Sequence, residues 1–156
     1  MIFWTVLLII HGLLALALLG AITHQTVSLW LPVRAPVGSF VGRFRAVPSH
    51  SYVTAIIVLY LTTFIMGAWI YTQYRFTSRL ALEQLRFFKT VGVFEMKEHL
   101  ATIGMILLVP YWAYWRQPLS PDYANARKNV TLLLAILVWA NFLIGHVANN
   151  ARGMGS

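Results

Sequence analysis

Four long apolar stretches, separated by shorter polar ones, set the pattern of this chain. They cover about residues 2–23, 52–74, 93–115 and 129–149. Each is close to the roughly 20 apolar residues that a helix needs to cross a bilayer core about 30 Å thick. The pattern therefore predicts an all-α protein, an integral membrane four-helix bundle formed by a single transmembrane domain over residues 1–156.

The segments between these stretches differ from one another. Residues 25–49 contain several prolines together with Arg34, Arg43 and Arg45, which predicts an irregular basic loop. In residues 75–91, apolar and charged side chains fall on two sides at helical spacing. The apolar positions are Leu80, Leu82, Leu85, Phe88 and Val91, and the charged ones are Arg79, Glu83, Arg86 and Lys89. This predicts a short helix along the membrane surface between the second and third spans.

The composition indicates a membrane location. Hydrophobic residues make up 59% of the chain and charged residues 10%, whereas soluble domains carry about 25% charged residues. We expect contact with the lipid bilayer, in a bacterial inner membrane. The net charge of +8 is assigned to Lys and Arg at helix ends near lipid headgroups, not to nucleic-acid binding. The basic residues divide evenly between the two faces, so they assign no orientation.

The chain contains no cysteine. This excludes disulfides, thiolate ligands, iron–sulfur clusters and covalently attached c-type haem.

All five histidines lie in a predicted span or at its edge: His11, His24, His50, His99 and His146. With a rise of about 1.5 Å per residue, His11 lies roughly 15 Å and His99 roughly 10 Å below the face that carries both termini. His146 lies a few residues from that same face. His24 and His50 lie at the opposite face. The histidines therefore form two layers.

Ionisable side chains inside a membrane are costly and usually functional, although a histidine also hydrogen-bonds neighbouring helices or headgroups. Several neutral imidazoles in apolar surroundings suit haem b, whose iron takes an axial histidine from each of two helices. We expect His11 and His99 to form the best pair of ligands. His146 is expected to replace either, or to bind a propionate or a quinone headgroup. A second haem would use His24 and His50.

Other residues fit this hypothesis. Glycines in the spans leave room for a flat macrocycle, although they are also common where helices pack closely. The expected partners of the haem propionates are Lys97, Arg75 and Arg152 on one face and Arg43 and Arg45 on the other. Asn141, inside the fourth span, predicts an interhelical hydrogen bond.

In helix count and histidine placement, the chain resembles the small membrane b-type cytochromes, including the cytochrome b subunits of formate dehydrogenases and hydrogenases. The resemblance implies two stacked haems held by histidines on four or five helices, with ligands on one helix at a spacing like that of His11 and His24. At about 100° per residue, however, the His24 side chain is turned about 140° from that of His11. We therefore expect one haem and not two.

The segment "FEMKEHL" at 94–100 offers a competing site. Glu95 and His99 share a helix face at i, i+4, with Glu98 adjacent. Such a pair binds a metal ion or relays protons beside a quinone. The ordinary alternative is an interfacial helix start, because acids suit the first turn and Lys97 extends to the headgroups.

The sequence shows no nucleophile-and-base arrangement, phosphate loop or dinucleotide fingerprint. We expect a haem b subunit that passes electrons between a quinone and a redox partner, docked on other membrane or peripheral subunits. The alternative is a non-catalytic accessory subunit of a larger membrane complex. An ion or proton transporter is a third interpretation.

Overall fold

The computed structural model describes residues 2–31 and 38–153, without the side chains of Arg45 and of residues 148–153. Within these ranges there is no β-strand, which confirms the all-α class. The helices are α1 (Ile2–Trp30), α2 (Phe40–Arg45), η1 (Ser49–Tyr52), α3 (Val53–Phe76), α4 (Ser78–Gln84), α5 (Phe88–Arg116), η2 (Pro121–Tyr123) and α6 (Ala124–Gly153).

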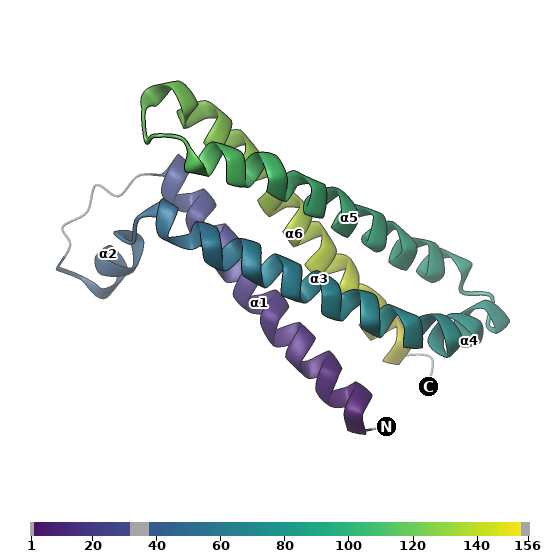
Figure 1. Cartoon of the computed structure of the whole chain (residues 1–156). Coiled ribbons are helices and arrows are strands. Elements are labelled where there is room, and N and C mark those ends of the chain that lie inside the picture. Colours follow the sequence, from purple (N-terminus) through teal and green to yellow (C-terminus); the bar gives the residue numbers. More distant parts are fainter. Residues whose placement is uncertain (1, 32–37, 154–156) are drawn as a thin grey trace.

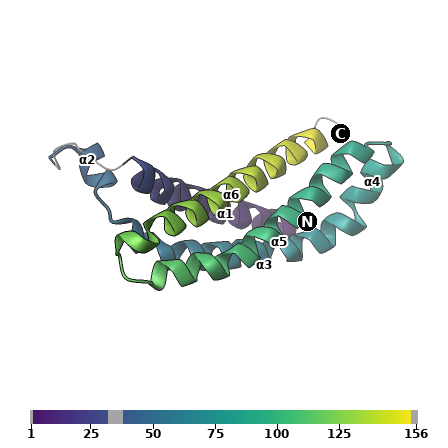
Figure 2. The same ribbon diagram turned by 90° about the horizontal axis from the view of Figure 1, so that it is seen from above.

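The four long helices run up and down beside one another (Figure 1). α1 packs on α3 and α6, and α5 packs on α6 and α3. They converge where α1 ends and α6 begins, and they diverge towards the N-terminus of α1, as both views show (Figure 2). We call the converging part, from Leu18 on α1 and up to Val138 on α6, the closed half. The other part is the open half.

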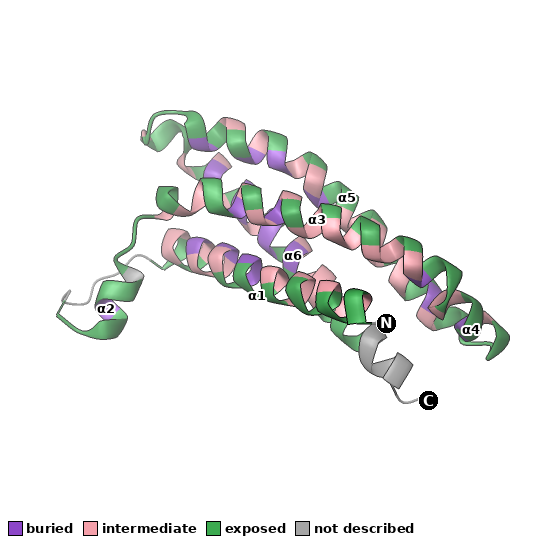
Figure 3. Cartoon of the chain, turned by 60° about the horizontal axis from the view of Figure 1, so that its bottom comes forward, coloured by how far each residue is buried: buried purple, intermediate pink, exposed green. Residues whose placement is uncertain are grey.

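The closed half contains the main core. Its fully buried apolar side chains include Ile22, Ile56, Leu134 and Tyr111, one from each long helix. In Figure 3 the buried residues gather between the helices, and exposed ones cover the outer faces. Many exposed residues are large and apolar: Leu13, Ile65, Ile106, Val109 and Leu133. An outer surface of this kind is suited to lipid, since soluble monomers rarely expose large apolar patches.

Among the described residues, three helical segments are long and apolar enough to cross a membrane: Ile2–Trp30, Ser49–Phe76 and Pro121–Val147. The chain is therefore a membrane protein, and the spans predicted at 2–23, 52–74 and 129–149 each have a candidate. α5 is not among the three. It has 29 residues, but its N-terminal part carries Glu95, Lys97 and Glu98, which reduce its apolar character.

The predicted surface helix at 75–91 is wrong in its extent. α3 continues to Phe76, α4 covers only Ser78–Gln84, and α5 begins at Phe88. The break lies at Arg86, whose φ of 60° is the left-handed conformation that non-glycine residues rarely adopt. Of the five predicted apolar positions, Leu82 and Val91 are buried. Those two side chains pack with Tyr74 into a small separate cluster at the open end.

Candidate functional site

A cavity of about 320 Å³ lies in the open half, between α1, α3, α5 and α6. On α1 its lining runs from Leu8 to Leu18, a length of about 15 Å. Phe64, Phe94 and Phe142 line it with other apolar side chains. The volume is at the lower end of the range of roughly 300–1,000 Å³ found for small-molecule and cofactor sites.

Four buried polar atoms on the described side chains have no hydrogen-bond partner, and all four residues line this cavity. The atoms are His11 Nδ1, Thr63 Oγ1, Tyr74 Oη and Asn141 Oδ1. Most buried polar atoms in proteins are paired, so an unpaired one needs an explanation such as a ligand or an ordered water. Four orphans around one cavity point to a molecule with polar atoms inside it.

His11 is the one histidine among these four residues. It is half-buried on α1, the charge of Lys97 acts on its ring, and the ring forms a hydrogen bond with the Thr63 backbone. The ring packs against Gly67 of α3, where a Cβ would lie 3.2 Å from His11 Cε1 and 3.9 Å from Nε2. Glycine at position 67 therefore makes the space that the imidazole occupies. The helix–helix contact holds the ring at the cavity wall.

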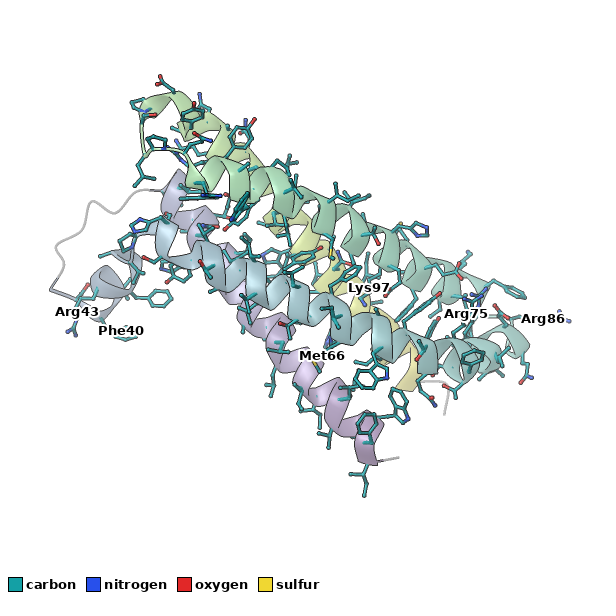
Figure 4. The ribbon with its side chains drawn as sticks, viewed as in Figure 1. Phe40, Arg43, Met66, Arg75, Arg86 and Lys97 are labelled. Carbon is teal, nitrogen blue, oxygen red and sulfur yellow. The ribbon has the colours of Figure 1, made fainter. Side chains whose placement is uncertain are left out.

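Lys97 carries the cationic charge of the cavity wall. Its side chain is 17% exposed and pairs loosely with Glu98, at 3.5 Å between Nζ and Oε1. The ammonium lies 5.0 Å from the centre of the Phe94 ring, and the stem lies over Gly145 of α6. Figure 4 shows Lys97 between the helices, whereas Arg75 lies towards the end of α3. Arg75 is exposed and does not line the cavity, and the Arg152 side chain is outside the described residues.

His11 and His146 both line the cavity, whereas His99, the expected partner of His11, does not. His146 lines the cavity on α6, with its ring stacked on Phe142 at 6.4 Å between centroids. His99 is exposed on α5, does not line the cavity, and bonds through Nδ1 with the Glu95 carbonyl 2.8 Å away in its own helix. The predicted depth of His99 places it near the cavity, but its helix turns it outward.

The two histidines of the second predicted pair have different surroundings. His24 uses both ring nitrogens, with Nε2 2.8 Å from the Phe44 carbonyl and Nδ1 3.4 Å from Ser28 Oγ. His50 is exposed on η1. His24 therefore links α1 to α2, which is a structural contact.

The "FEMKEHL" segment forms ion pairs and no metal group. Arg79 bonds Glu83 through Nε and Glu95 through Nη1, both at 2.8 Å. The hydrogen bond to Glu83 raises the pKa of the Arg79 guanidinium, which therefore stays charged. Among the residues that the structure describes, no group of three or more His, Asp or Glu side chains is placed to hold a metal ion. Glu95 thus ties α5 to α4.

Sequence analysis missed Thr63 and Tyr74 and interpreted Asn141 wrongly. The Asn141 amide nitrogen donates to the Leu137 carbonyl of its own helix, 2.8 Å away, and its oxygen is one of the four atoms without a partner. The expected interhelical bond is not made. Threonine and tyrosine in an apolar span are ordinary helix residues, so no sequence signal separates these two from the rest.

Comparison of the chain with protein-family models, with curated proteins and with solved structures finds no match in any of the three. The site is therefore interpreted from its own geometry.

Proposed function

We propose that this chain is a membrane electron-transfer subunit that binds one haem b in the cavity of the open half. His11 and His146, which both line this cavity, would hold the haem iron. The proposal is carried by one observation: the buried His11 Nδ1 has no partner, in a cavity that a second histidine also lines. In this proposal α5 also crosses the membrane, since its 29 residues are about 43 Å long.

The residues of the cavity fit such a group. Haem needs an elongated apolar cavity. The lining of this cavity extends about 15 Å along α1 and includes phenylalanines on α3, α5 and α6. Lys97 is the cation on the wall, and it would hold a propionate as a charge-assisted pair. Haem iron, when bound, supplies one-electron chemistry with a potential set by its axial ligands and surroundings.

The protein's own contribution is to orient the ligands and to exclude water. Gly67 lets the His11 ring lie directly against α3, so the imidazole has little freedom to turn. Tyr74 and Leu82 line the cavity and pack with Val91, and this apolar cluster would help to exclude water from a bound haem. The electron partners, a quinone and a redox subunit, stay predictions. The location in a bacterial inner membrane also stays a prediction.

The test is a reduced-minus-oxidised spectrum of the purified chain, followed by two single variants. We expect a b-type α-band in the wild type that is lost in His11→Ala. The matched control His99→Ala removes an exposed histidine on α5 and is expected to keep the band. A colourless wild-type protein would contradict the proposal and favour the accessory-subunit alternative. A band that persists in His11→Ala would contradict the assignment of His11 as a haem ligand.

A further inference from the structure

A second hollow, of about 420 Å³, lies on the outer side of the bundle, away from the haem cavity. It is formed by α1, α2 and α6, and we call it the lateral groove. Its lining includes Leu16, Gly20 and Val27 of α1, Phe44 of α2 and Trp139 of α6. Leu16, Val27, Phe44 and Trp139 are themselves exposed. The groove thus opens on the outer surface of two candidate membrane spans.

The groove has an apolar end and a polar end. Leu16, Leu19 and Gly20 form the apolar end, towards the middle of α1. His24 and Ser28 form the polar end, beside α2. From Leu16 to Ser28 the groove follows α1 for about 18 Å. This length is slightly more than half of a hydrocarbon core about 30 Å thick. One acyl chain of a lipid covers about half of that core.

α2 closes the polar end and supplies positive charge. The helix lies to one side of the bundle (Figure 1), where the Phe44 carbonyl is 2.8 Å from His24 Nε2 and the two rings are 4.6 Å apart. Phe40 and Arg43 extend outward from α2 (Figure 4). Residues 31–52 contain Arg34, Arg43 and Arg45 and no acidic residue. Basic segments at a membrane surface attract anionic lipids.

We propose that the lateral groove binds one anionic phospholipid. The acyl chain lies along α1 between Phe44 and Trp139, and the phosphate lies at the level of α2, near Arg43. Trp139 fits this role because its indole nitrogen already donates to Thr23 Oγ1, 3.0 Å away, so that the ring is held as a wall of the groove. The groove is separate from the haem cavity, and lipid binding there does not depend on haem.

Gly20 gives a direct test. A Cβ built on Gly20 meets no atom within 4 Å, so a side chain at this position starts in open space, and Gly20→Leu is expected to fill the groove. Gly92→Leu is the matched control, because position 92 on α5 is equally open and lies outside the groove. The full chain is incubated with phosphatidylglycerol, or with phosphatidylcholine of the same acyl chains, and its lipid adducts are measured by native mass spectrometry.

The wild type and Gly92→Leu are expected to retain one phosphatidylglycerol, and Gly20→Leu to bind it at least tenfold more weakly. Arg43→Gln is expected to reduce the preference for phosphatidylglycerol over phosphatidylcholine by about fivefold. This corresponds to the attraction between one basic residue and an anionic membrane surface. Unchanged binding by Gly20→Leu would overturn the proposal. So would equal binding of the two lipids by the wild type, or a dimer that Gly20→Leu disrupts, since the groove would then bind a second copy.

Discussion

The closed and open halves are built from the same four helices, but they differ in how their buried polar groups are paired. In the closed half, Tyr111 donates to Gln25 at 2.8 Å, and Gln25 donates to the Ser49 carbonyl at 2.9 Å. The Trp115 indole donates to Thr131 at 3.1 Å. In the open half, the hydroxyl of Thr63 has no partner.

Arg127 is a further paired group of the closed half. It is buried near the start of α6, and its guanidinium donates to the carbonyls of Pro118 and Ser120, both at 2.9 Å. Each of these polar contacts connects two helices or a helix and a loop. The buried side-chain polar groups described in the closed half are therefore paired within the chain, whereas four of those around the cavity of the open half are not.

The largest contrast is expected from core packing in the closed half. Leu134→Ala removes a fully buried side chain and should lower the free energy of unfolding by about 2 kcal/mol, near the low end of such substitutions because lipid is as apolar as the core. Leu133→Ala is the matched control, since its side chain is exposed. Titration with SDS in mixed micelles measures both. Equal losses would show that the closed half is not the packed core.

Two threonines give the sharpest test of the difference between the halves. Thr131→Val leaves the Trp115 indole without its acceptor and should cost about 1 kcal/mol of unfolding free energy. Thr63→Val removes a buried hydroxyl that has no partner and should change the haem-free protein by less than about 0.5 kcal/mol, towards higher stability. The same SDS titration compares them. A cost at position 63 as large as that at 131 would contradict the distinction.

The smallest effect is expected from a single methyl group at the cavity wall. In Gly67→Ala the new Cβ lies 3.2 Å from the His11 ring, which must shift by a few tenths of an ångström. We expect haem to be retained a few-fold less well, with little change in stability. Gly92→Ala controls for the higher helix propensity of alanine. Retention of haem by Gly67→Ala equal to that of this control would show that the His11 position is not critical.

Depth along the membrane was predictable from the sequence, but rotation about each helix was not. A helical rise of about 1.5 Å per residue places His11 and His99 at similar levels. Glu98 and Ala101, on either side of His99 in α5, line the same cavity as His11. Each residue also turns the side chain by about 100°, and which side of α5 faces the bundle depends on packing that the sequence does not state. His99 therefore points outward, and Lys97, two positions earlier, lines the cavity.

The connection at 75–91 shows a second feature that could not be predicted from the sequence. The spacing of apolar positions was correctly helical, but the positive φ at Arg86 that divides it into α4 and the start of α5 has no signal such as glycine or proline. No sequence pattern predicts that the hydroxyls of Thr63 and Tyr74 lack a hydrogen-bond partner. An unpaired hydroxyl is a property of the space around it, and only the assembled helices define that space.

The most direct test of the proposed function is the number of haems per chain, measured by pyridine extraction of the purified protein. We predict one haem b per chain, because two histidines line the cavity described in the open half and both nitrogens of His24 are already hydrogen-bonded. A value of zero would contradict the function proposed for the open half. A value of two would contradict the assignment of His24 to a structural contact.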